Sequence, residues 1–164
     1  MLKHIAPNLK ATDKYIYDID IIYLKTKGFL GLILDIDNTI IGWGQKEVPE
    51  KSRLWIEKAQ QEGFKIAFVS NAFPKKAERI AGYFHSPFIS NARKPSKYGF
   101  KKALKALDLP AEKVVMIGDQ LFTDIFGGNK IGLYTIWVKP MSNREFIFTK
   151  LTRVLEKITD KYIL

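Results

Sequence analysis

The chain has 164 residues, of which 46% are hydrophobic and 27% charged, so it suits one globular domain with a buried core and not a disordered chain. It contains no cysteine, which excludes disulfides and thiolate metal sites and fits a cytoplasmic protein. The longest uncharged apolar run, residues 28–34, is far below the ~20 residues of a transmembrane helix, and the N-terminus lacks the apolar segment of a secretory signal.

The net charge of +10 is concentrated in one segment of the chain. Between Pro74 and Lys105 there are nine lysines and arginines and one acid, Glu78, so 9 − 1 gives +8 of the total. Such a segment attracts phosphate esters, nucleic acids or an anionic bilayer. A solvated basic face that serves only solubility is an equal alternative, so the charge by itself identifies no ligand.

The first 28 residues are expected to form a helical flank. Ile16, Ile19 and Ile22 recur there at helical spacing, which predicts a helix with one apolar side. We expect this flank to pack on the domain, in preference to lying on a membrane surface or binding a partner helix.

Five apolar runs bounded by turn residues are expected to be β-strands. Most do not alternate with polar residues, which is typical of strands buried on both faces of a parallel sheet. The runs are residues 30–37, 65–71, 113–119 and 133–139, with a weaker one at 87–91.

Amphipathic segments between these runs predict helices. Pro49 precedes the first, Pro74 begins the second, and Ser96 is placed to cap the third. The expected helices are residues 51–61, 74–84, 96–107, a short one at 123–131, and a C-terminal helix at 143–164. Strands that alternate with helices form parallel βαβ units, so we predict a doubly wound α/β fold in a single domain over residues 1–164.

Polar side chains end three of the predicted strands or follow them closely. Ligands bind at the carboxyl ends of parallel strands, so we expect these side chains to meet at one crevice, with a lysine from a nearby loop. The residues are Asp35, Asp37, Ser70, Asn71, Lys94, Asp119 and Asp124.

The crowding of acids at this crevice predicts a divalent cation. Asp35 and Asp37 are alternate residues and point the same way, and two carboxylates about 6 Å apart repel by ~3 kcal/mol at an effective dielectric of about 20. Solvation explains a single aspartate after a strand, but four acids at two strand ends favour a metal site. Oxygen ligands suit Mg²⁺, and Mn²⁺ accepts them as well.

A cation, Lys94 and the Ser70 hydroxyl together form a site for a phosphoryl group, because all three neutralise or bind its oxygens. One carboxylate can attack phosphorus and form an aspartyl-phosphate. The other can protonate the leaving alcohol and then deprotonate the attacking water. The arrangement therefore predicts a phosphatase.

Four short motifs resemble those of the haloacid dehalogenase (HAD) superfamily. DIDNT at 35–39 matches its DxDxT motif, and SN at 70–71, KP at 94–95 and GDQLFTD at 118–124 are similar to its second, third and fourth motifs in the same order. With the GW that follows DIDNTI, the chain looks most like the YqeG-type subfamily of subclass IIIA. The resemblance implies a Rossmann-like core and phosphatase activity.

The resemblance also implies roles for the acids. Asp35 would be the nucleophile and a Mg²⁺ ligand, and Asp37 the general acid/base that lends its backbone carbonyl to the metal. Thr39 would bond to the backbone of the motif and orient these two. Asp119 would bind Mg²⁺ directly, with Asp124 as a further ligand or a neighbour of one.

Three more residues are implied to hold the phosphate. The Ser70 hydroxyl and the backbone of Asn71 would bind phosphate oxygens. Lys94 would balance the negative charge of both the nucleophile and the phosphate, which gives it a catalytic and a binding role.

The sequence encodes no cap domain, because only residues 40–48 follow the first motif and only 22 residues, 72–93, separate the second from the third. YqeG-type proteins are related to phosphatases of phosphatidylglycerophosphate. A phospholipid head group at the inner face of a membrane would suit an open site beside a basic segment, with the protein bound peripherally.

Other substrates and classes remain as alternatives. A phosphatase of small soluble esters or of polynucleotides has the same motifs, and a non-enzymatic nucleic-acid module would use the basic segment, although no nucleic-acid motif is present. Its aromatics Tyr83, Phe84, Tyr98 and Phe100 are expected in helix cores. A receiver-type signalling domain is disfavoured, because both acids of DIDNT share one strand. The oligomeric state is left open.

Overall fold

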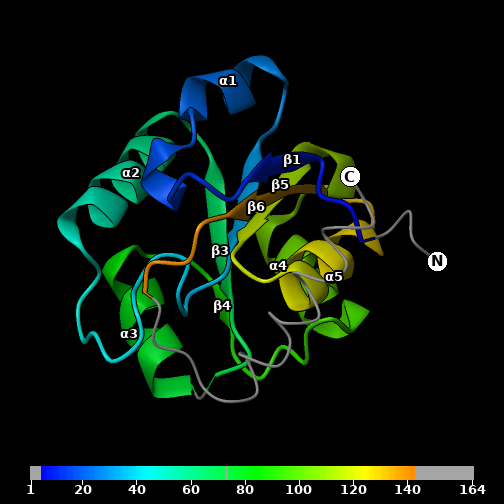
Figure 1. Cartoon of the computed structure of the whole chain (residues 1–164). Coiled ribbons are helices and arrows are strands. Elements are labelled where there is room, and N and C mark those ends of the chain that lie inside the picture. Colours follow the sequence, from blue (N-terminus) through cyan, green and yellow to red (C-terminus); the bar gives the residue numbers. More distant parts are fainter. Residues whose placement is uncertain (1–4, 73, 143–164) are drawn as a thin grey trace.

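The computed structural model describes residues 5–72 and 74–142, and its centre is a six-stranded parallel sheet with the order β1-β6-β5-β2-β3-β4 (Figure 1). The strands are β1 (Leu9–Ala11), β2 (Gly31–Leu34), β3 (Lys65–Val69), β4 (Phe88–Ile89), β5 (Val114–Gly118) and β6 (Tyr134–Val138). From β2 the chain builds β3 and β4 on one side, and then β5 and β6 on the other. The predicted doubly wound α/β fold is therefore confirmed.

The centre of the sheet positions the site. Leu34, the last residue of β2, is in register with Phe68 of β3 and Ile117 of β5. All of β2 is buried, as expected for a strand covered on both faces. The residues that follow these three strands consequently emerge side by side at one edge of the sheet.

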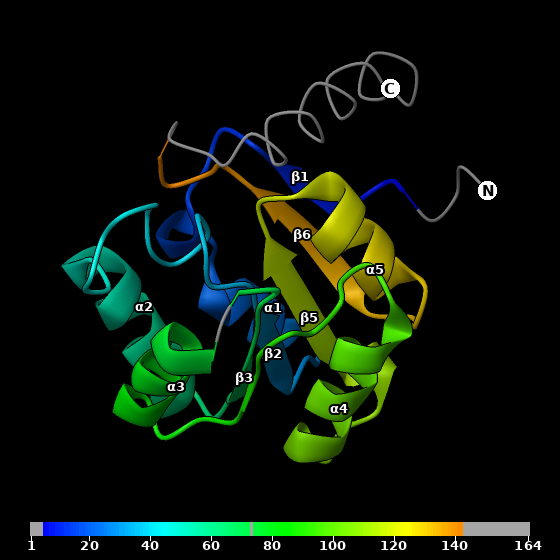
Figure 2. The same cartoon turned by 90° about the horizontal axis from the view of Figure 1, so that it is seen from below.

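Helices cover both faces of the sheet, α2 and α3 on one and α4 and α5 on the other (Figure 2). Leu32 and Leu34 pack in the core with α1, α2 and α3, whereas Ile33 packs with α4. The helices are α1 (Ile21–Thr26), α2 (Glu50–Gln61), α3 (Pro74–Tyr83), α4 (Lys97–Leu107) and α5 (Phe126–Asn129), with 3-10 turns at Ile16–Asp18 and Ala111–Lys113 and a π-helical turn at Leu121–Ile125.

Local sequence explains the ends of α4. The Ser96 side chain accepts a hydrogen bond from the Tyr98 backbone N–H, as the sequence predicted for a helix cap. At the other end, Asp108 adopts a left-handed conformation with φ of 51°, which terminates the helix.

The N-terminal flank differs from expectation. Residues 9–11 form β1, an unpredicted edge strand whose Leu9 is in register with Ile136 of β6, and only a 3-10 turn and α1 follow it instead of one longer helix. The expected helix at 143–164 lies outside the described residues, so the domain limits stay a prediction. No cap domain is inserted within the part that the structure describes. None of its helices is both long and apolar enough to cross a membrane.

Candidate active site

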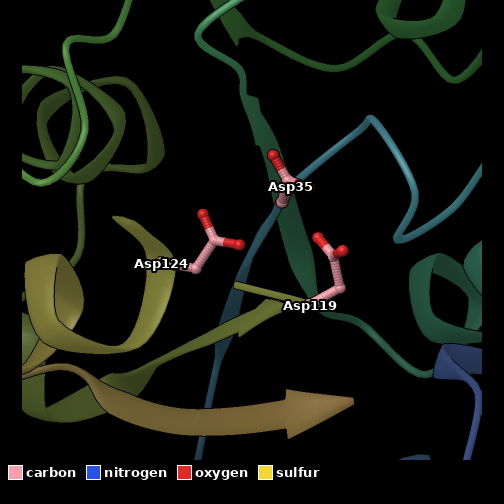
Figure 3. Close-up of side chains that lie close together, drawn as sticks. All are labelled: Asp35, Asp119 and Asp124. Carbon is pink, nitrogen blue, oxygen red and sulfur yellow. The ribbon is translucent and has the colours of Figure 1, made fainter. Parts of the chain in front are cut away.

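Three aspartates from separate segments meet at the carboxyl edge of the sheet (Figure 3). Asp35 follows β2, Asp119 follows β5, and Asp124 lies in the π-helical turn after β5. One carboxylate oxygen from each lies within 4.8 Å of the others, and the residues are only 4%, 0% and 0% exposed. We call these three residues the acid cluster.

Lys94 is the cation of the acid cluster. It lies in the loop between β4 and α4, and its Nζ donates to Asp35 Oδ1 and, over 2.7 Å, to Asp124 Oδ1. The side chain is 3% exposed. When all three carboxylates are ionised, they and the one ammonium carry a charge of about −2 in a buried space, which a divalent cation would neutralise.

Burial and neighbouring charge shift the pKa of both partners. Burial raises the pKa of Asp35 well above its usual value, and although Lys94 lowers it, the carboxylates of Asp124 and Asp119 raise it further. Burial acts to lower the pKa of Lys94, but the carboxylates of Asp124 and Asp35 outweigh it and hold that pKa above its usual value. Lys94 is therefore a permanent cation at this position.

The turn after β2 orients Asp35. The Thr39 Oγ lies 2.9 Å from Asp35 Oδ2 and 3.2 Å from Asp119 Oδ1, between the two carboxylates. Asn38 bends the chain with φ of 66°, a left-handed conformation that asparagine tolerates. Its side chain donates to the Ser142 carbonyl over 3.0 Å and accepts from the Ser142 N–H over 2.8 Å, so the segment after β6 anchors this turn.

Asp37 lies apart from the acid cluster, in a more exposed place. Ser70 Oγ donates to its Oδ2 over 3.3 Å, and Lys76 Nζ donates to its Oδ1 over 2.6 Å. The crowding that the structure shows is that of Asp35 with the two later aspartates. The chain leaves the sheet after Asp35, and α3 brings an ammonium to the Asp37 carboxylate.

Asn71 connects the second motif to the third. Its side chain donates to the Lys94 carbonyl over 3.1 Å and accepts from the Lys94 N–H over 2.8 Å. Ser70 adds a backbone hydrogen bond, accepting from the Ala92 N–H over 3.1 Å. These bonds hold the Lys94 loop against the end of β3, so all eight candidate residues named from the sequence, Thr39 included, lie in one connected region.

Two positions were missed by the sequence analysis. Lys76 belongs to no motif, and its only signal is membership of the basic segment. Gly118 is required because a Cβ there would overlap the Asp124 side chain, which packs directly on the end of β5. The spacing between GDQ and Asp124 gives no sign of that approach.

The donor set of the acid cluster fits a hard divalent cation. Three buried carboxylates present oxygen atoms close together, and Mg²⁺ and Mn²⁺ prefer oxygen ligands. Cysteine is absent from the chain, and His85, the histidine within the described residues, is not part of the cluster, so these three ligands do not suit a metal that requires sulfur or imidazole.

Comparison with known proteins gives a consistent picture. A family model described as HAD-hydrolase-like matches residues 91–145. The probable phosphatase YqeG of Bacillus subtilis is 34% identical over 144 residues, which are 88% of this chain and 84% of that protein. The phosphatidylglycerophosphate phosphatase 1, chloroplastic/mitochondrial, of Arabidopsis thaliana is 26% identical over 161 residues, which are 92% of this chain but only 46% of that protein.

A solved structure, that of a HAD phosphatase from Thermococcus onnurineus, superposes with a TM-score of 0.51 at 19% identity, over 66% of this chain and 58% of the other. The fold and the relatives together define a phosphatase with a Rossmann-like core. The chain belongs to the haloacid dehalogenase superfamily and, within it, to the YqeG-type phosphatases.

Proposed function

We propose that this phosphatase hydrolyses phosphomonoesters with the help of Mg²⁺ and through an aspartyl-phosphate on Asp35. The single observation that carries the proposal is the acid cluster with its one lysine. A buried charge of about −2 is costly in an empty site, but it matches a divalent cation in the resting enzyme.

The cation would be held by the carboxylates of the acid cluster and the backbone carbonyl of Asp37. When bound, it neutralises the charge on the oxygens of the phosphoryl group. Lys94 supplies further positive charge beside Asp35. The Ser70 hydroxyl and the backbone N–H of Asn71 donate to the remaining phosphate oxygens, a placement that the position of both residues at the end of β3 supports.

Asp35 attacks phosphorus in the first step. Its carboxylate forms an oxygen–phosphorus bond while the bond between phosphorus and the leaving alcohol breaks. Thr39 and Lys94 contact different oxygens of this carboxylate, which fixes the direction of attack. Asp37 enters this step protonated, and its proton passes to the leaving oxygen, which departs as the alcohol and leaves Asp37 as the carboxylate.

Asp37 completes the cycle. It accepts a proton from a water molecule, whose oxygen attacks phosphorus and breaks the bond to Asp35. Inorganic phosphate is released, Asp35 is again a carboxylate, and Asp37 is again protonated. The partly exposed side chain of Asp37 suits this role, since both the leaving alcohol and the water arrive from solvent.

The substrate we propose is phosphatidylglycerophosphate, held as a head group at an anionic membrane surface by a peripherally bound enzyme. An uncapped site admits a bulky ester, and a relative with that activity is 26% identical. Release of phosphate from phosphatidylglycerophosphate vesicles with added Mg²⁺ tests the proposal, with sugar, nucleotide and polynucleotide phosphates for comparison.

We expect phosphate to be released fastest from the lipid. The Asp35→Asn variant should release no phosphate from the lipid or from any of the soluble esters. Good turnover of a soluble ester without preference for the lipid would overturn the substrate assignment. Phosphate release by Asp35→Asn equal to that of the wild type would overturn the mechanism.

A further inference from the structure

Lys76 lies on the solvent side of the proposed acid/base residue. Its ammonium is 2.6 Å from Asp37 Oδ1, and its side chain is 27% exposed, against 3% for Lys94 in the acid cluster. In the proposed mechanism the phosphoryl group binds beside Lys94, and the leaving alcohol departs beside Asp37, the residue that Lys76 contacts. An ammonium has three donors and the ion pair with Asp37 uses one, so Lys76 can also bind an anion.

A second cation, Arg79, lies on the same face of α3, about one turn after Lys76. Arg79, Ile80 and Tyr83 follow Lys76 at the i+3, i+4 and i+7 positions, which share one face of a helix. The Arg79 guanidinium donates to the carbonyl of Lys46, in the loop that follows the first motif. This contact brings the loop across to α3.

A cavity of about 540 Å³ lies along this face of α3. Its lining residues are Lys46, Glu47, Val48, Glu50, Arg53, Arg79, Ile80 and Tyr83. Val48 and Ile80 contribute apolar surface, and the two glutamates offset part of the positive charge, while Arg53 is paired with Glu57. Lys76 does not line the cavity, so Arg79 is the residue that connects it with the helix face of Lys76.

We propose that Lys76 and Arg79 form a subsite for a second anionic group, carried by the leaving alcohol of the substrate. The inference rests on the proposed function, because it takes Asp37 as the residue that protonates that alcohol. The enzyme then selects phosphomonoesters by charge on the far side of the scissile bond, without a cap domain. A phosphodiester and a carboxylate both carry the negative charge that this subsite would bind.

The preference is measured with three soluble esters. Glycerol 3-phosphate has a neutral leaving alcohol, 3-phosphoglycerate carries a carboxylate on it, and the deacylated head group of phosphatidylglycerophosphate carries a phosphodiester. We expect kcat/KM to be about tenfold higher for either ester with a negatively charged leaving alcohol than for glycerol 3-phosphate, the size of one charge-assisted contact. Lys76→Gln removes this preference and Lys76→Arg retains it.

Lys75→Gln is the matched control, because Lys75 is exposed one position earlier on α3 and is not on the helix face of Lys76 and Arg79. It should leave the preference unchanged. An equal loss of kcat/KM on all three esters in Lys76→Gln would show that Lys76 acts only on Asp37 and overturn the subsite. The same follows if the wild type shows no preference.

Binding to Asp35→Asn by calorimetry, with Mg²⁺ present, separates this inference from the proposed function. The head group should bind about tenfold more tightly than glycerol 3-phosphate, and the double variant Asp35→Asn/Lys76→Gln should bind both alike. If the wild type releases no phosphate from any ester, the proposed function fails and calorimetry still decides the subsite. Equal affinities in Asp35→Asn overturn the subsite alone.

Discussion

Thr39 places one hydroxyl between the carboxylates of Asp35 and Asp119, both of which are buried. A hydroxyl in this position stabilises the orientation of Asp35 and screens it from its neighbour. The hydroxyl carries no net charge, so we expect Thr39 to affect catalysis through the orientation of the Asp35 carboxylate.

We expect Thr39→Val to lower kcat roughly ten- to hundredfold, because a buried carboxylate loses a hydrogen bond worth about 1–3 kcal/mol. Thr39→Ser, which keeps the hydroxyl, should recover most of the rate. Steady-state kinetics on one soluble ester measure both. Equal rates for Thr39→Val and Thr39→Ser would contradict the assignment.

Asp119→Asn tests the charge balance of the acid cluster. Carboxylate oxygens within 4.8 Å of one another repel by at least ~3 kcal/mol per ionised pair at an effective dielectric of about 20, so removing one charge should stabilise the protein in a chelating buffer. Thermal unfolding with EDTA should show a higher Tm for the variant than for the wild type. With Mg²⁺ in excess the order should reverse, since only the wild type keeps all three carboxylates.

At the scale of elements, the turn after β5 depends on close contact between a strand end and a helical turn. Gly118 ends β5, and Asp124 packs against its backbone with an Oδ2 that also accepts the Gln120 N–H over 3.1 Å. The turn can hold Asp124 beside Lys94 only because position 118 has no side chain.

Gly118→Ala should destabilise the fold by about 1–3 kcal/mol and weaken Mg²⁺ binding, because the added methyl group displaces Asp124. Gly82→Ala is a control in α3, where a Cβ would meet nothing within 4 Å and should be neutral or slightly stabilising. Urea unfolding and Mg²⁺ titration measure the two effects. An unperturbed Mg²⁺ affinity in Gly118→Ala would contradict the role of Asp124.

Elements with strong local signals were predictable from sequence. Asp35, Ser70 and Asp119 could be placed together because each follows an apolar run, and parallel strands end at one edge. The strand at residues 9–11 was missed because three residues, one of them charged, carry no clear pattern, and its pairing with β6 is entirely non-local. Lys76 was missed because a lysine in the first turns of a helix is usually solvated.

At the scale of the whole molecule, the basic segment does not form one surface. Lys94 is buried in the acid cluster, Lys76 and Arg79 lie on α3, and α4 on the opposite face of the sheet carries four more lysines (Figure 2). The four aromatics of the basic segment were expected in helix cores. This was wrong for two of them: Phe84 and Phe100 are buried, but Tyr83 and Tyr98 are 58% and 46% exposed.

The lysines and arginines on the surface allow a prediction about the rate of hydrolysis at different salt concentrations. If cations on the surface attract it to an anionic bilayer, hydrolysis of phosphatidylglycerophosphate in vesicles should fall severalfold between 50 and about 300 mM NaCl, because screening weakens surface electrostatics. Hydrolysis of a neutral-alcohol ester in solution should change much less. Parallel salt profiles for the two substrates would contradict a peripheral membrane role.

The hydrogen bonds between Asn38 and Ser142 have a consequence for biosynthesis. A ribosome makes the two aspartates of the DIDNT segment first, and Ser142, which anchors the turn between β2 and α2, is added 104 residues after Asn38. A nascent chain that has not yet reached Ser142 therefore lacks this anchor, and the turn gains its final support only after β6 has been synthesised.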